Sequence, residues 1–361
     1  MNIDKRDLIL LNMTQVIGFK KLKALLDEFK TTEAIFSAPI KRLAAVEGIG
    51  LAIAKSIKCA KSKFNVDKEI DLAQRLGVDI RTIFDNRYPV LLKGIFSPPI
   101  VLYIKGDFTD TDIFSIGIVG ARACTQYGRR MAKEVAGELS DHDITVVSGM
   151  ARGIDTAAHK GCLSAGGRTI AVLGNGLASV YPPENKNLAD LIANNGALVS
   201  EFPMKTPPHK RNFPQRNRVI SGLSKAIVVV EAAKKSGALI TADLAIDQGK
   251  EVFAIPGPCG SLASEGTNNL IRDGARLIGN ASELIEELGV LSKSKLSKNN
   301  EVGFSNTFEE SIYGLLSDEP HDEDDIVESI SLSAKGLKKA LLDMEMKGLV
   351  KQLPGRLYVR A

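Results

Sequence analysis

Between residues 113 and 278 the sequence alternates short apolar runs with stretches of helical character. The seven apolar runs are 113–120, 144–149, 168–173, 196–202, 225–232, 251–256 and 275–278. Apolar strands without polar alternation are typical of parallel sheets buried on both faces, and the intervening helices supply the crossovers. The pattern predicts an α/β fold with a Rossmann-like, doubly wound, mostly parallel sheet as the core domain, over residues 108–288.

The loops after the carboxyl ends of such strands are where a doubly wound sheet binds its ligands. The first two loops, 120–128 and 148–155, are rich in glycine and lead into helices. Gly120 and Gly149 allow the backbone to approach a ligand closely. Arg122 can donate a forked pair of hydrogen bonds to a phosphate, with a structural salt bridge as the alternative. We predict an anion-binding surface at these loops.

Two titratable residues follow on the helix after the second loop. Asp155 and His159 are four residues apart, a spacing that allows a shared metal or proton. No third ligand stands nearby in the sequence. The spacing therefore favours a capping aspartate and a histidine that packs in the core or faces a phosphate.

A third loop, 174–179, nearly reproduces the dinucleotide-binding fingerprint. The third glycine is replaced by Ser179, and Pro182 interrupts the helix that would receive a pyrophosphate. The phosphate loop typical of ATPases, G-x-x-x-x-G-K-[ST], does not occur in the sequence. We predict no cofactor.

Cations surround one aromatic residue in the segment 202–226. The cations close in sequence to Phe213 are Lys210, Arg211, Arg216 and Arg218. Such cations track the phosphates of single-stranded nucleic acid while the ring stacks on a base, a contact worth about 1–3 kcal/mol whichever base it is. A loop bounded by prolines would hold Phe213 out from the sheet, and packing in the core is the alternative.

A further anion site is predicted where the next strand ends. Ser236 and Gly237 open a helix whose first N–H groups can bind one more phosphate.

The N-terminal residues 1–65 show helical periodicity only. A tight Gly-x-Gly turn at 46–51 and a weaker copy at 16–21 resemble a helix-hairpin-helix within a SAM-like domain. The segment contains 12 Lys and Arg against 6 Asp and Glu, so it has a net charge of +6 against −2 for the rest. It is a candidate phosphate-facing surface, with an ordinary helix interface or solvated face as the alternatives.

The remaining segments complete the expected organisation. Residues 66–107 form a connecting segment that packs on the core, and 289–306, rich in Ser, Lys and Asn, form a linker. Residues 307–361 predict three helices and a hairpin at Pro354-Gly355, in the manner of a winged helix. An acidic loop within that domain, 322–325, argues against a purely DNA-binding use.

The composition narrows the protein class further. No apolar run is long enough to span a membrane, and the N-terminus lacks the apolar stretch of a secretory signal, so we expect a cytoplasmic protein. The four cysteines are widely spaced and form no C-x-x-C pair, which gives no sign of a zinc or redox site.

Seven motifs in order along the core resemble the DprA/Smf family. They are GARACTQYG, SGMARGIDTAAH, YPPEN, FPQRNRVISGLS, EAAKKSGALITA, VFAIPG and GTNNLIRDGA. The resemblance extends to the helical N-terminal domain and the winged-helix tail. It implies a bacterial protein without enzymatic activity that binds and protects single-stranded DNA and helps to load the RecA recombinase during natural transformation, as a homodimer.

The resemblance also assigns the DNA pocket to particular positions. It implies contacts with DNA from Arg122, Lys210, Phe213, Arg216, Asn217 and Arg218. The first turn of the family often has a hydroxyl residue where this chain has Ala121, so this position has no hydroxyl to contact a phosphate.

A nucleotide phosphoribohydrolase-like enzyme is the alternative, because related Rossmann-like domains use a glycine-rich loop and a nearby glutamate. Glu231 stands at a comparable strand end. The loop that follows keeps one glycine of that signature and inserts Lys234 and Lys235, which favours binding of a polyanion over cleavage of a nucleotide.

Overall fold

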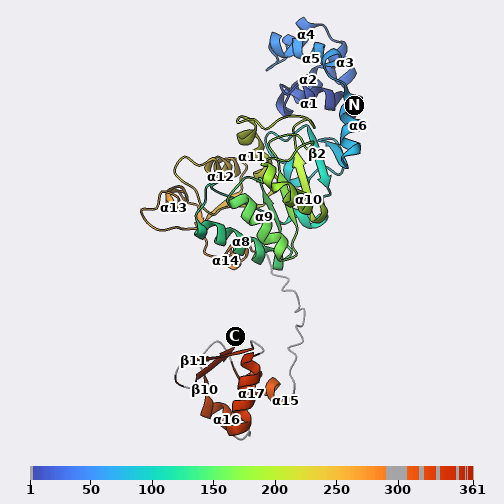
Figure 1. The fold of residues 1–361 in the computed structure, drawn as a ribbon. Helices are drawn as coiled ribbons and strands as arrows, with labels where there is room; N and C mark the ends of the chain where they lie inside the picture. Colours follow the sequence, from blue (N-terminus) through green and yellow to red (C-terminus); the bar gives the residue numbers. More distant parts are fainter. Residues whose placement is uncertain are drawn as a thin grey trace. The chain divides into compact units, whose positions relative to one another are not determined.

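The structure, a computed structural model, describes residues 3–289, 307–316, 321–330, 334–346, 349–353, 355 and 357–360. The chain forms two compact units, Met1–Lys293 and Ser294–Ala361, which are described separately (Figure 1). The predicted linker lies outside the described residues from position 290 onward. Within the described ranges, no helix is long and apolar enough to cross a membrane.

A nine-stranded sheet with the order β1-β2-β6-β5-β4-β3-β7-β8-β9 organises the first unit. Its strands are Val78–Thr82 (β1), Val101–Gly106 (β2), Ser115–Val119 (β3), Thr145–Ser148 (β4), Thr169–Val172 (β5), Ala197–Ser200 (β6), Ala226–Val229 (β7), Glu251–Ala254 (β8) and Arg276–Leu277 (β9). Only β1–β2 and β2–β6 pair antiparallel. Strands β3 to β7 are buried at every position, which explains why their sequences show no polar alternation. The predicted Rossmann-like, mostly parallel sheet is confirmed.

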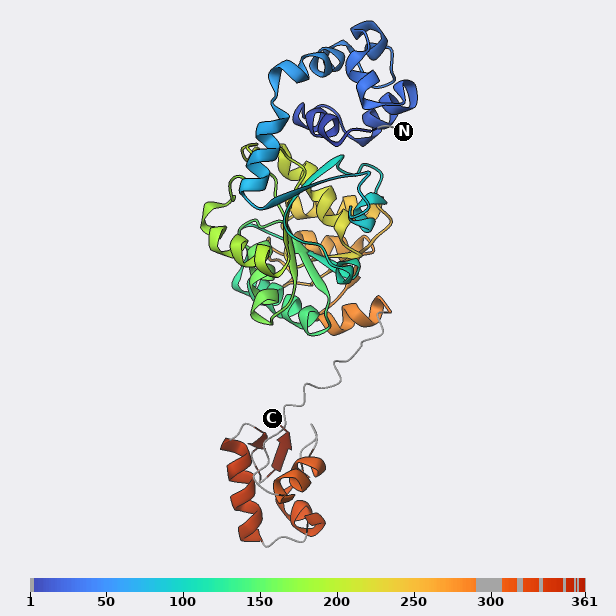
Figure 2. The same cartoon turned by 90° about the vertical axis from the view of Figure 1, so that its right-hand side faces the viewer.

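Helices cover both faces of this sheet (Figure 2). One face packs against α8 (Gln126–Asp141), α9 (Ile154–Ser164) and α14 (Ala281–Glu287), and the other against α7 (Val90–Lys93), α11 (Asn212–Leu223) and α12 (Gly237–Asp247). The first unit also contains α10 (Lys186–Asn195) and α13 (Glu265–Arg272). The strand order reverses between β3 and β7, and this switch point is where a doubly wound sheet opens a crevice for ligands.

The connecting segment continues the sheet. It contributes α6 (Val66–Arg75) and the strands β1 and β2, and β2 pairs with β6.

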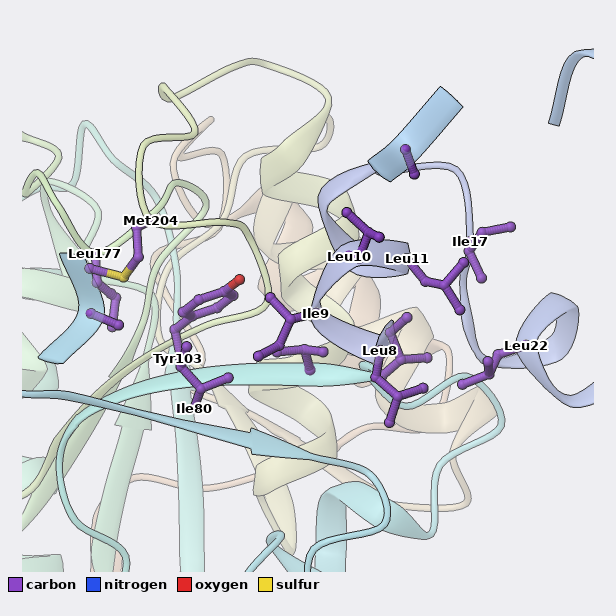
Figure 3. Packing of buried hydrophobic residues seen from close by; sticks show 14 of the residues in the cluster. Leu8, Ile9, Leu10, Leu11, Ile17, Leu22, Ile80, Tyr103, Leu177 and Met204 are labelled. Atoms are coloured by element: carbon purple, nitrogen blue, oxygen red, sulfur yellow. The ribbon is translucent and has the colours of Figure 1, made fainter. Parts of the chain in front are cut away.

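The N-terminal helices pack directly on this edge. They are α1 (Lys5–Met13), α2 (Phe19–Phe29), α3 (Thr32–Ser37), α4 (Ile40–Ala44) and α5 (Leu51–Lys63). Figure 3 shows Ile9 of α1 beside Tyr103 of β2, and Leu8 and Ile80 belong to the same cluster. The helical region and the sheet therefore share one hydrophobic cluster.

The second unit is the predicted winged helix. It contains α15 (Thr307–Leu315), β10 (His321–Asp322), α16 (Glu323–Ile330), α17 (Ala334–Met346), β11 (Val350–Leu353) and β12 (Leu357–Arg360), with the sheet order β10-β12-β11. The prediction of an acidic loop at 322–325 is wrong, because this run ends β10 and begins α16. Acidic residues at a helix N-terminus suit the helix dipole.

Candidate nucleic-acid interface

A cavity of about 460 Å³ opens at the switch point between β3 and β7. Val119 and Gly120 line it where β3 ends, and Ser236 and Gly237 line it where α12 begins. The cavity therefore lies at the carboxyl ends of the central strands, where the sequence predicts the ligand site.

The loop after β3 is fixed by close packing. A Cβ on Gly120 would lie 2.5 Å from Ile154 Cγ1 and 2.9 Å from Glu231 O, so only glycine fits without a shift. Thr125 caps α8, because its hydroxyl accepts a hydrogen bond from Gly128 N at 3.1 Å. These contacts place Arg122 at the mouth of the cavity with an exposed side chain.

Glu231, the residue that the enzyme alternative depends on, anchors this same loop. Its carboxylate is buried and accepts hydrogen bonds from Thr125 N at 2.9 Å and from the Thr125 hydroxyl at 2.5 Å. It does not belong to the cavity lining. The geometry gives Glu231 the role of a helix-terminus anchor.

Arg216 forms the floor of the cavity. It is only 4% exposed, and its Nη1 donates to Gly149 O at 2.5 Å and to Val172 O. A Cβ on Gly149 would lie 2.5 Å from Nη1, so this glycine makes room for the guanidinium. The sequence predicts that the backbone at Gly149 comes close to a ligand. In the structure, the group that lies close to Gly149 is the buried guanidinium of Arg216.

A buried carboxylate lies near this guanidinium. Asp155 lines the cavity and is 6% exposed, and its Oδ2 accepts a hydrogen bond from Ala151 N at 3.2 Å. Burial raises the pKa of Asp155 to about 6, an effect that Arg216 opposes. Burial lowers the pKa of Arg216 to about 10, which Asp155 opposes and Arg122 reinforces. Arg216 therefore stays charged at neutral pH.

His159 is a packing residue. It is fully buried, and its Nδ1 lies 2.7 Å from Thr169 Oγ1. Burial lowers its pKa to about 3, so the ring stays neutral. No group of three potential metal ligands occurs in the described part of the chain.

Phe213 lies in the first turn of α11. The prediction of a loop here is wrong, because residues 212–223 are helical. The ring packs on Gly174, where a Cβ would lie 2.9 Å from its Cδ1. The guanidinium carbons of Arg122 and Arg216 lie 4.9 and 5.8 Å from the ring centroid. Phe213 is therefore a half-buried aromatic platform flanked by two cations.

The structure brings eight of the ten predicted site residues to this one cavity. They are Gly120, Arg122, Lys210, Phe213, Arg216, Asn217, Ser236 and Gly237. Ser236 caps α12, accepting a hydrogen bond from Ala238 N at 3.3 Å, and Asn217 Nδ2 donates to Gly237 O at 3.3 Å. Gly149 lies beneath Arg216, and Arg218 lies outside the lining, on another side of α11.

Sequence reasoning missed one aromatic residue of the site. Tyr181 lines the cavity, and its ring centroid lies 5.9 Å from that of Phe213 at an interplanar angle of 43°. The signal was present, since Tyr181 begins the YPPEN motif.

The core domain matches a known protein family. Residues 79–289 match the family described as DNA recombination-mediator protein A. The sequence is 34% identical to Protein Smf of Synechocystis sp., over 95% of this chain and 96% of that protein. The chain belongs to the DprA/Smf family.

The flanking domains of this DprA/Smf protein match as well. Residues 9–60 match a SAM-like helix-hairpin-helix tandem, and residues 306–356 match the DprA winged helix domain.

Two solved structures resemble the fold. DNA processing protein A from Streptococcus pneumoniae is 32% identical with a TM-score of 0.69, covering 80% of this chain and 99% of that one. The structure of DNA processing protein A from Helicobacter pylori, described as giving insights into its single-stranded DNA binding mode, is 31% identical with a TM-score of 0.53. It covers 58% of this chain and 95% of that one.

Proposed function

We propose that this protein binds single-stranded DNA in the cavity between β3 and β7. The observation that carries the proposal is the Phe213 ring, flanked by the guanidinium groups of Arg122 and Arg216 in one cavity. The relative from Helicobacter pylori, whose structure is described in terms of single-stranded DNA binding, supports it.

The chemistry of the lining suits a flexible polyanion. Arg122 and Lys210 are exposed and can follow successive phosphates, while Phe213 offers a face to a base. Arg216 cannot leave the floor, because its Nη1 is bonded to two carbonyls; it supplies a fixed positive charge. Contacts to phosphates and to the face of a base carry no sequence information, so we expect binding with little sequence preference.

We further propose that the protein helps to load RecA onto the bound strand during homologous recombination and natural transformation, as a cytoplasmic homodimer. Membership of the DprA/Smf family supports this role, and a binding mode indifferent to sequence suits incoming DNA of any origin. Assembly of RecA filaments on strands coated with single-strand-binding protein should be faster when this protein is added. Sedimentation at rising concentration tests the dimer.

The position of Glu231 supports the proposal of a non-enzymatic role. Its carboxylate is occupied by Thr125 and lies outside the cavity lining. We expect no release of base from nucleoside monophosphates. Turnover that disappears in Glu231→Ala, with the fold intact, would support the enzyme alternative.

The decisive experiment is a salt titration of binding to single-stranded and duplex oligonucleotides. The logarithm of the affinity for single strands should fall with the logarithm of salt by about 0.7 for each phosphate neutralised. Arg122→Ala and Phe213→Ala should weaken binding, whereas Arg75→Ala, an exposed cation on α6 away from the cavity, should not. Equal affinity for duplex, or no loss in either cavity variant, would contradict the proposal.

A further inference from the structure

Helix α11 presents different sides to two parts of the molecule. Phe213, Arg216 and Asn217 line the cavity. Gln215 and Arg218, three residues apart and therefore neighbours on the helix surface, lie instead in a small polar cluster beside the N-terminal helices. The sequence motif does not distinguish these sides, because Arg216 and Arg218 stand only two residues apart in one short run.

The Arg218 guanidinium is engaged at both of its terminal nitrogens. Nη1 donates to Ser97 O at 2.5 Å, and Nη2 pairs with Oε2 of Glu201. The two side chains of this ion pair are 17% and 9% exposed. Gln215 Nε2 donates to the same oxygen at 3.0 Å. Both polar side chains on this side of α11 thus converge on one carboxylate.

Glu201 connects this cluster to the N-terminal helices. Its backbone oxygen accepts a hydrogen bond at 3.0 Å from Asn12 Nδ2, near the end of α1. A cavity of about 120 Å³ beside it is lined by polar groups that include Asn12, Gln15 and Glu201. Burial raises the pKa of Glu201, and Arg218 opposes that effect. Arg218 is the cation that pairs with this buried carboxylate.

A buried ion pair of this kind fixes geometry because either partner alone would be an uncompensated charge. The Arg218 fork joins three separate elements, namely α11, the loop containing Ser97 and the end of β6. We propose that Arg218 is a positioning residue that holds α11 in the orientation that turns Phe213 and Arg216 toward the cavity, and that it makes no contact with DNA. This inference rests on the proposed function of the cavity.

The salt dependence of binding separates a positioning residue from a phosphate contact. If Arg218→Ala leaves α11 correctly oriented in about one molecule in ten, the apparent Kd for a single-stranded oligonucleotide rises about tenfold. That rise should be equal at every salt concentration, so the salt slope stays unchanged. Lys210→Ala, which removes an exposed cation of the cavity, should reduce the slope by about 0.7. Arg218→Lys, which keeps the charge but loses the fork, should fall between wild type and Arg218→Ala.

An optical reporter makes the test independent of DNA. The protein has no tryptophan, so Phe213→Trp introduces a single indole at the platform. Acrylamide should quench this indole more strongly when Arg218→Ala is added, and partly so with Arg218→Lys, in samples whose circular dichroism shows a folded protein. Arg75→Ala in the same background should leave quenching unchanged. A purely structural role would lower the urea midpoint without altering quenching in the folded state.

These measurements give distinct outcomes. A slope reduced by Arg218→Ala as much as by Lys210→Ala would make Arg218 a phosphate contact and overturn the inference. Unchanged affinity and unchanged quenching would overturn it as well. If wild type binds no single strands at all, the proposed function fails, and the quenching experiment still decides whether Arg218 orients α11.

Discussion

The cavity of the sheet and the N-terminal hairpins both combine glycine turns with cations, yet their glycines have different roles. At Gly120 and Gly149 a Cβ would lie 2.5 Å from Ile154 Cγ1 and from Arg216 Nη1. At Gly18 and Gly50, which precede α2 and α5, a Cβ would meet nothing within 4 Å. Gly120 and Gly149 are needed for space, whereas Gly18 and Gly50 have room for a side chain.

The cavity adds a buried cation to its exposed Arg122 and Lys210, and the hairpin turn at 16–21 has no such buried cation. Arg216 is buried and fixed on the carbonyls of Gly149 and Val172. Lys20 in the hairpin is exposed, and Lys21 Nζ donates back to Val16 O at 2.9 Å. A fixed charge needs no reorganisation when an anion arrives, while an exposed lysine must lose side-chain freedom. We therefore expect the cavity to dominate binding.

The largest expected effect is the difference in stability between two glycine-to-alanine substitutions, one in each region. Gly120→Ala should destabilise the protein by about 3 kcal/mol, because the new Cβ overpacks against Ile154 and Glu231 O. Gly50→Ala is the matched control, since neither glycine has a left-handed φ, and it should change stability by less than about 0.5 kcal/mol. Urea unfolding of both variants measures the difference. Similar losses would remove the distinction between the two regions.

The next effect concerns the aromatic residue at the start of a helix in each region. Phe213→Ala should weaken binding of single strands by about 1–3 kcal/mol, roughly ten- to more than a hundredfold in Kd, because a stacking face is lost. Phe19 begins α2 beside the hairpin turn and is likewise half-buried, so Phe19→Ala is its counterpart. It should leave the affinity of the folded protein unchanged. A comparable loss in Phe19→Ala would show that the hairpins also stack bases.

The sheet and the loops around the cavity were predictable because each depends on local sequence. Uninterrupted apolar runs identified the strands, and glycines identified the loops that approach one another. Helix α11 was not predicted, because its proline was interpreted as the edge of a loop. Pro214 in fact fits the first turn of a helix, where a missing N–H costs nothing. The burial of Arg216 depends on carbonyls from two different strand ends, and that meeting exists only in three dimensions.

A smaller effect should appear with pH, through Asp155. Its folded pKa of about 6 is higher than the value of about 3.9 expected in the unfolded chain. Its contribution to stability is therefore fully present below pH 4 and is lost as pH rises through about 6. Protonation also removes a negative charge beside Arg216, so binding of single strands should strengthen as pH falls through about 6, by about 1 kcal/mol or fivefold in Kd.

Asp155→Asn tests this directly, because the amide oxygen can still accept from Ala151 N. The variant should bind at pH 7.5 as tightly as wild type does at pH 5.5, and the step in its affinity near pH 6 should disappear. Asp141→Asn, which removes an exposed carboxylate at the end of α8, should keep the step. A step that survives in Asp155→Asn would assign the titration to another group.

The smallest expected effect comes from the hairpin lysines. Lys20 and Lys21 line a cavity of about 330 Å³ together with Glu47, whose charge opposes theirs. Lys20→Ala combined with Lys21→Ala should therefore change the affinity for single strands by less than about twofold at 0.15 M salt and leave the salt slope unaltered. If the hairpins do neutralise phosphates, the slope will instead fall by about 0.7 for each phosphate that the variant no longer neutralises. In that case, the space around a glycine would not tell whether its turn binds DNA or is only structural. The DNA path would then include the N-terminal helices.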